Sequence, residues 1–204
     1  MIKWFSFAFG LLAAAPAAVA QPFDYYVAAL TWTPTWCVAE GNPGDGQCDP
    51  ARDLGFTLHG LWPQYEEGWP ADCDSDEADP SRRETAAMAD VMGSGGLAWY
   101  QWKKHGRCSG LPARDYFALA RRIYAALDLP RPDDGRATAA EVAASVLAAN
   151  PALDPDGVIV TCRSGRIEEV RLCLTPDLAP RACAPDVLAD ACRQRGPLEM
   201  PPIP

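Results

Sequence analysis

The chain has 204 residues, and its 27 acidic residues against 18 basic ones give it a net charge of -9 at pH 7. This length suits one domain with a full hydrophobic core, and no segment after the N-terminal region is apolar and long enough to cross a bilayer. The acidic balance excludes strong long-range attraction of a polyanion, so such a partner would have to be held by a local cluster of cations.

Residues 1–20 have the organisation of a cleaved secretory signal. Lys3 precedes an apolar run of about a dozen residues, and Ala18-Val19-Ala20 provides the small residues of a cleavage site. We therefore expect a mature chain of residues 21–204 that forms a single domain. It should be secreted or periplasmic, act as a monomer and have no membrane-embedded part.

The cysteines predict a disulfide framework, because an even number in an exported protein usually pairs. The chain lacks C-x-x-C and H-E-x-x-H motifs and has only two histidines, so a zinc site has few candidate ligands. We expect no metal and no other cofactor. Two of the cysteines bracket a loop rich in Gly, Pro, Asn and Asp and could pair across it. The eight cysteines are Cys37, Cys48, Cys73, Cys108, Cys162, Cys173, Cys183 and Cys192, of which the first two bracket the loop.

The first predicted elements are two strands. Residues 23–32 are rich in aromatic and β-branched residues, which favours a buried strand. Residues 55–63 alternate apolar and polar side chains with the period of a strand, which turns His59 away from the core. Gly60 and Pro63 should end this strand soon after His59. The pattern of residues 55–63 therefore predicts that His59 lies at the end of a strand.

The remaining elements alternate between helices and loops before a C-terminal hairpin. Strands at both ends with helices between them indicate an α+β fold, with a central antiparallel sheet flanked by helices and stapled by disulfides. In chain order we predict an exposed acidic loop over 65–80, a helix over 81–92 opened by a Ser81/Glu84 capping box, a helix leading into 99–105, a helix over 113–127, and a helix from a Thr138/Glu141 capping box to Asn150. A hairpin of 158–162 and 166–174 around Ser164-Gly165, a Pro- and Cys-rich segment over 176–192 and an irregular tail after Gly196 complete the chain.

The stretch from Trp99 to Cys108 concentrates the chemically versatile side chains. It contains one of the two histidines and the only two lysines outside residues 1–20. On a helix, Tyr100 and Lys104 lie on one stripe, and Gln101 and His105 lie on the adjacent one. Four side chains could therefore contact a single ligand.

Gly106 is predicted to end this helix in the left-handed conformation that glycine adopts without a steric penalty. His105 would then lie in the last turn. Backbone carbonyls there carry the negative end of the helix dipole, which favours a protonated imidazole. The sequence thus predicts a positive spot with a titratable group.

Each histidine alone is more often a structural hydrogen-bonding residue than a catalyst. As a pair they could supply a general base and a general acid, because imidazole has an ordinary pKa of about 6.5. A nucleophilic triad has little support, since the cysteines are expected in disulfides and G-x-S-x-G is absent. Phosphoryl transfer to a hydroxyl of the substrate itself needs neither a protein nucleophile nor a metal, and RNA offers its 2' hydroxyl. Trp62 and Trp69 could stack on a base, although most tryptophans fill cores.

Two segments, residues 56–63 (FTLHGLWP) and 102–108 (WKKHGRC), resemble the active-site segments of the ribonuclease T2 family, and Trp32-x-Pro34-x-x-Cys37 and the cysteine layout extend the resemblance. It implies an α+β fold and metal-independent cleavage of single-stranded RNA through a 2',3'-cyclic phosphate. By the same resemblance, His105 would deprotonate the 2' hydroxyl, His59 would protonate the departing 5' oxygen and Lys104 would stabilise the transition state. Trp62 is similar to a base-site residue of the family.

The chain departs from the family pattern at three positions. Tyr100-Gln101 replaces the usual His-Glu, and Gln64 stands where an acidic residue often follows Trp-Pro. We expect Gln101 to act in catalysis and Tyr100 and Gln64 to bind substrate, because their side chains still offer hydrogen bonds. Without a nearby carboxylate the pKa of His105 should be lower than in relatives, so we expect a pH optimum that differs from that of the most acid members.

The family layout also implies disulfides Cys73–Cys108, Cys162–Cys192 and Cys173–Cys183, which leaves Cys37 with Cys48. The main alternative is a non-catalytic secreted member of the same fold that binds a nucleic acid or a protein. A metal-dependent nuclease or phosphatase is a second alternative, and full activity in EDTA would exclude it.

Overall fold

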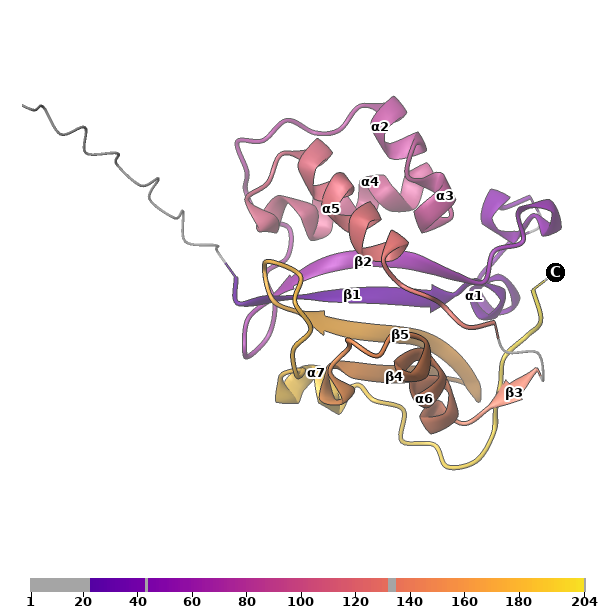
Figure 1. The fold of residues 1–204 in the computed structure, drawn as a ribbon. Helices are drawn as coiled ribbons and strands as arrows, with labels where there is room; N and C mark the ends of the chain where they lie inside the picture. The colour runs from indigo at the N-terminus through magenta and orange to yellow at the C-terminus, as the bar shows by residue number, and fades with distance from the viewer. Residues whose placement is uncertain (1–22, 43, 132–134, 204) are drawn as a thin grey trace, which may run out of the picture.

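The computed structural model describes residues 23–42, 44–131 and 135–203, so the predicted signal at residues 1–20 lies outside the described residues. Its centre is a sheet whose strand order is β2-β1-β5-β6-β3, with β4 paired to β5 beside this path (Figure 1). The pairs β1–β2, β1–β5, β4–β5 and β3–β6 are antiparallel, and a single β5–β6 contact is parallel. The strands are β1 Tyr25–Trp32, β2 Phe56–Gln64, β3 Arg136–Ala137, β4 Val158–Arg163, β5 Arg166–Leu174 and β6 Leu198–Glu199.

Helices cover the sheet in two groups (Figure 1). The segment from α2 to α5 lies over β2 and β1, whereas α6 and α7 lie beside β4 and β5. The α-helices are α1 Thr33–Ala39, α2 Arg82–Ala86, α3 Ala89–Met92, α4 Gly95–Lys104, α5 Ala113–Ala125, α6 Ala139–Ala149 and α7 Pro185–Ala189. Short 3-10 turns are η1 Gly46–Cys48, η2 Pro50–Arg52, η3 Gly106–Ser109 and η4 Pro155–Gly157. The α+β prediction is confirmed, and within the described ranges no helix is long and apolar enough to span a membrane.

Strand β1 is the central element of the core. Every one of its side chains except Thr31 is buried, and it is paired along both edges, with β2 on one side and β5 on the other. Aromatic and β-branched residues suit such a position because their bulk packs well on a pleated surface. The prediction of a buried strand here is confirmed.

The capping boxes at Ser81/Glu84 and Thr138/Glu141 are both present, and each starts a helix as predicted. The single helix predicted over 81–92 is wrong in one respect, because it divides into α2 and α3. At the division the Met88 N–H donates to the Thr85 carbonyl, three residues back. This is the hydrogen-bond spacing of a 3-10 turn, which interrupts the α-helix.

The C-terminal half contains the predicted hairpin. Strands β4 and β5 pair antiparallel, and Ser164 and Gly165 turn between them with φ of 50° and 79°. Positive φ at both central residues matches the right-handed twist of the strands. The Pro- and Cys-rich segment contains the short helix α7, and the tail that was expected to be irregular contains the short strand β6.

Three of the four disulfides are those that the family resemblance implied, and the fourth is the Cys37–Cys48 pair expected by elimination. They join Cys37–Cys48, Cys73–Cys108, Cys162–Cys192 and Cys173–Cys183.

Candidate active site

Strand β2 continues through Gly60 and Pro63 to Gln64, so the prediction that these residues end the strand was wrong. Strand β2 lies at the edge of the sheet and pairs only with β1 among the described strands. Proline is tolerated in an edge strand, because the outward-facing backbone N–H that it lacks would have no neighbouring strand to pair with.

His59 occupies a β-bulge in this strand. In the register with β1, Ala29 is opposite Gly60 and Leu30 is opposite Leu58, so His59 is the extra residue. A bulge bends the strand and redirects the side chain that it carries. Leu58 is fully buried, whereas the His59 side chain is 33% exposed, as the sequence predicted.

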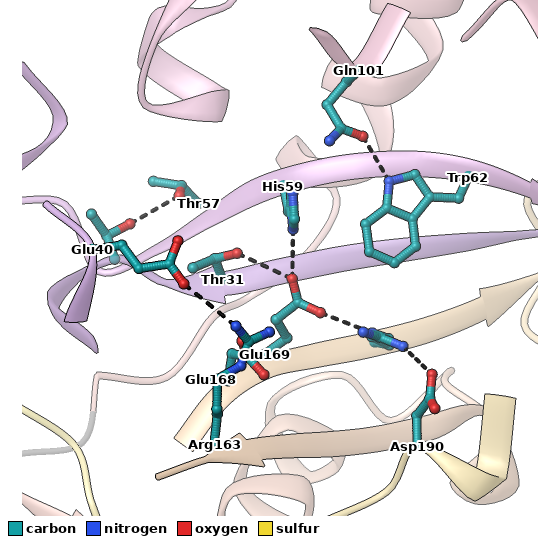
Figure 2. Close-up of polar contacts among 12 residues, drawn as sticks. Thr31, Glu40, Thr57, His59, Trp62, Gln101, Arg163, Glu168, Glu169 and Asp190 are labelled. Atoms are coloured by element: carbon teal, nitrogen blue, oxygen red, sulfur yellow. Dashed lines mark hydrogen bonds and ion pairs between the residues drawn. The ribbon is translucent and has the colours of Figure 1, made fainter. Parts of the chain in front are cut away.

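A buried carboxylate holds the His59 ring (Figure 2). Glu169, on β5, lies with Oε1 2.6 Å from His59 Nδ1, and its Oε2 accepts a hydrogen bond of 2.9 Å from Arg171 Nε. Burial would raise the pKa of the Glu169 carboxyl, but the hydrogen bond from His59 and the charges of His59 and Arg171 hold it well below its usual value. The carboxylate is therefore ionised at neutral pH. No sequence motif pointed to Glu169.

His105 has the opposite environment. It follows the last residue of α4, its N–H donates to the Gln101 carbonyl, and its residue is 6% exposed. Its Nδ1 is buried without a hydrogen-bond partner in the described part of the chain. Burial lowers the pKa of His105 to about 3, and the charges of Lys104 and His59 add to the effect. The prediction that the helix dipole would favour a protonated imidazole was wrong, because desolvation dominates.

Gly106 does not adopt the predicted left-handed conformation, and it begins the 3-10 turn η3 instead. Glycine is required there for another reason. A Cβ at this position would lie 2.5 Å from Trp102 Cε3 and 3.0 Å from Tyr116 Cε1. The close approach of the backbone to these rings lets the chain turn directly after His105.

The indole of Trp62 lies between the two imidazoles. Its ring centroid is 5.2 Å from that of His59 and 5.3 Å from that of His105. Trp62 Nε1 donates to Gln101 Oε1 at 2.7 Å (Figure 2), and a Cβ at Gly60 would collide with both atoms. The Gln101 oxygen is thus engaged by Trp62, which leaves the amide nitrogen to donate to a ligand.

These side chains meet at a cleft of about 400 Å³, which we call the histidine cleft. Arg171, which contacts the carboxylate of Glu169, lies over the Trp62 ring at 5.2 Å in the wall of this cleft. Lys104 lies 5.7 Å from the Tyr100 ring, so two cations border the space. All the residues predicted for catalysis or substrate binding line the cleft, namely His59, Trp62, Gln64, Tyr100, Gln101, Lys104 and His105, together with Trp69.

A larger cleft of about 550 Å³ adjoins the first and shares His59 and Tyr100 with it. We call it the threonine cleft, because Thr31, Thr33 and Thr57 form part of its lining. His59 therefore stands where two hollows meet.

The acidic loop of residues 65–80 fastens the end of α4. Asp72 N–H donates to the Lys104 carbonyl at 2.8 Å, and the Cys73–Cys108 disulfide follows immediately. Asp79 accepts hydrogen bonds from Trp102 Nε1 and from Arg107. This loop was predicted to be an exposed surface, but three of its residues fix the helix that carries Lys104.

The fold and site together define a disulfide-stapled α+β protein whose cleft holds two imidazoles, one buried and one paired with a carboxylate. Residues 23–183 match the Ribonuclease T2 family, and the chain belongs to this family.

Among curated proteins, a ribonuclease of Aeromonas hydrophila is 44% identical over 101 residues, which cover 50% of this chain and 45% of that protein. A probable ribonuclease of Haemophilus influenzae is 32% identical over 122 residues, which cover 53% of this chain and 45% of that protein. The match thus spans less than half of each of these relatives.

Among solved structures, the RNase-related protein from Calystegia sepium aligns with a TM-score of 0.68 at 21% identity, covering 88% of this chain and 97% of that one. RNase NT in complex with 5'-AMP aligns with a TM-score of 0.63 at 22% identity, covering 88% and 98%. At these identities the likeness concerns the fold.

Proposed function

We propose that this protein is an endoribonuclease that cleaves single-stranded RNA by metal-independent transphosphorylation and leaves 2',3'-cyclic phosphate ends. The observation that carries the proposal is the contrast between two histidines on one cleft. Burial and Lys104 keep His105 neutral, whereas His59 lies against an ionised carboxylate. Two titratable groups whose environments differ in this way are suited to act as base and acid.

In this reaction neutral His105 takes the proton of the ribose 2' hydroxyl. The 2' oxygen attacks the neighbouring phosphorus, a bond from phosphorus to the 2' oxygen forms, and the bond to the 5' oxygen breaks. Protonated His59 gives its proton to the departing 5' oxygen. The electrons and protons balance without a protein nucleophile, a metal or any other cofactor.

The other cleft residues serve the phosphate and the base. Lys104 places a cation beside the charge that develops on the phosphate oxygens, and Gln101 can donate its amide N–H there. Tyr100 contributes a further hydroxyl. Trp62 offers a stacking face and Gln64 a buried amide to a nucleobase.

The test is cleavage of a short RNA by the oxidised protein in EDTA, with the product termini identified. Wild-type protein should give cyclic phosphate ends, and His59→Ala and His105→Ala should each reduce the rate by about 100-fold or more. Arg131→Ala, which alters an exposed ion pair with Asp53 outside both clefts, is the matched control and should retain activity. Loss of cleavage in EDTA would overturn the metal-independent reaction.

The second candidate is a non-catalytic binding protein, and the Tyr100-Gln101 pair in place of His-Glu favours it. The test is whether the folded wild-type protein cleaves RNA between about pH 4 and pH 8, the range around the ordinary pKa of histidine. If it does not, the binding function replaces the endoribonuclease function as the proposal. Binding of labelled RNA, measured without turnover, would then identify the ligand.

We infer further that the chain is exported through the signal at residues 1–20 and works as a monomer of residues 21–204. Four disulfides suit an oxidising compartment such as the periplasm or the medium. The N-terminal residue of the protein recovered outside the cytoplasm tests the cleavage site, and its sedimentation tests the monomer.

A further inference from the structure

Glu169 reaches His59 across an intervening strand. Thr31 of β1 is opposite Thr57 of β2 on one side and opposite Glu169 of β5 on the other. Strands are about 4.8 Å apart, so His59 and Glu169 start from backbones about 10 Å apart. The Glu169 side chain crosses over Thr31, whose hydroxyl donates to Oε1 at 3.3 Å, and ends 2.6 Å from the imidazole (Figure 2).

Both oxygens of this carboxylate are engaged. Oε1 contacts Thr31 and His59, while Oε2 accepts from Arg171 Nε, and Arg171 in turn pairs with Asp190 at 2.7 Å. The Glu169 residue is only 4% exposed. With its orientation fixed from both sides, the carboxylate can accept one hydrogen from the imidazole, and that hydrogen must be on Nδ1.

Stability gives a weak reason to place an ion here. Moving a carboxylate out of water costs free energy that its attraction to a cation often fails to recover. Apolar side chains of similar volume often stabilise a protein as much as a buried ion pair does. The Glu169 side chain extends across a neighbouring strand to contact His59. Its buried charge is better explained by an effect on the orientation and protonation of that imidazole.

We propose that Glu169 is a positioning residue for His59, which keeps the ring hydrogen on Nδ1 and turns Nε2 to the histidine cleft as the proton donor to the leaving oxygen. The proposal rests on the proposed RNA cleavage. When the bond from phosphorus to the 5' oxygen breaks, the Nε2 proton moves to that oxygen. The ring becomes neutral and retains its Nδ1–H on Glu169.

The activity test compares two substrates on Glu169→Gln. RNA has an alkoxide leaving group that needs a proton, whereas a nucleoside 3'-(4-nitrophenyl phosphate) releases an anion that is stable without one. We expect kcat/KM for RNA to fall about 10- to 100-fold and that for the nitrophenyl ester to change less than about threefold. The ratio of the two rates does not depend on how much of the sample is folded.

Glu168→Gln is the matched control. Glu168 is the preceding residue of β5 and pairs with Arg163 at 2.7 Å, so the variant removes the same charge without touching the imidazole. It should cleave both substrates at the wild-type ratio. A wild-type ratio of the two kcat/KM values in Glu169→Gln would overturn the proposal, whether both substrates lose activity equally or neither does.

A second readout is independent of turnover. The chain has only two histidines, so two imidazole spin systems are expected in proton–nitrogen correlation spectra. Neutral His59 should carry its hydrogen on Nδ1 in the wild type and should lose that preference in Glu169→Gln. A wild type with the hydrogen on Nε2 would overturn the positioning role even if the protein cleaves RNA. If the wild type cleaves no RNA while the Nδ1 hydrogen is present, the proposed function fails and the carboxylate–imidazole contact stands.

Discussion

Protonation of His105 should make the folded protein lose stability in mild acid. Its pKa is about 3 in the folded chain and 6.5 when unperturbed, so between these values the unfolded state binds the extra proton. The free energy of unfolding therefore rises with pH across this window. The contribution of His105 is fully present above the unfolded pKa and is lost as the pH falls toward 3.

The expected loss in the free energy of unfolding follows from the size of the pKa shift of His105. One pKa unit corresponds to about 1.4 kcal/mol, and integration from about pH 7.5 to about pH 4.5 gives about 2.5 kcal/mol from this one group. Glu169 acts in the same direction, since its depressed pKa adds stability that is lost below its unfolded value of 4.5. The stated range stops at that value, so Glu169 contributes little to the loss.

The assay is urea unfolding of the oxidised wild type and of His105→Gln at several pH values. His59 and the carboxylates are common to both proteins, so the difference between the two curves isolates His105. The wild type should lose about 2.5 kcal/mol more than the variant over the range. Parallel curves would refute the argument that burial holds this imidazole neutral.

The same shift changes the expected pH dependence of cleavage. From the missing carboxylate beside His105 we predicted a pH optimum that differs from that of the most acid family members. A lower pKa of the general base has the opposite consequence, because the base is already deprotonated at acid pH. We now expect the acid limb of kcat/KM to lie below about pH 5, and a pH–rate profile on RNA measures it.

Three further changes test the surroundings of the site. Gly106→Ala should cost about 1–3 kcal/mol in denaturant unfolding through overpacking, because its Cβ would lie 2.5 Å from Trp102 Cε3; the cost should vanish if that ring moves freely. Replacing Cys73 and Cys108 together by Ala removes a bridge with a sequence separation of 35 and should cost about 4 kcal/mol, measured in urea, and an unchanged midpoint would contradict this. Gln101→Glu adds a carboxylate near the buried imidazole, so the acid limb of kcat/KM should move to higher pH, and an unmoved limb would show that the charge is not felt.

The elements predicted correctly are those whose signals are local. The capping boxes at Ser81 and Thr138, the Ser164-Gly165 turn and the buried strand β1 each depend on a few neighbouring residues. Helical spacing also placed Tyr100, Gln101 and Lys104 correctly on one cleft, because α4 is regular over that stretch.

The short helices α1 and α7 were missed although a signal was present. Each has proline in its first turn, at Pro34 and Pro185, where the missing N–H and the fixed φ suit a helix start.

Glu169 could not be found from local patterns. It is 110 residues from His59 in the sequence, and the two side chains meet across β1, which pairs with the strand of Glu169 on one side and with the bulged strand of His59 on the other. In the sequence, Glu169 is one of two adjacent glutamates in a strand-like run, and nothing there distinguishes it from Glu168. Strand order and register decide which carboxylate reaches the imidazole.

The two histidines illustrate how the chain obtains opposite chemistry from one residue type. His105 ends a helix that is packed against the sheet, with a lysine as its neighbour, so the charged form is penalised twice. His59 lies at a bulge with one side open to two clefts and the other against an anion, so the charged form has a partner. The family resemblance assigned the base to His105 and the acid to His59 from sequence position alone. In the proposed reaction the buried, neutral imidazole of His105 suits the base, and the imidazole of His59, which lies against a carboxylate, suits the acid.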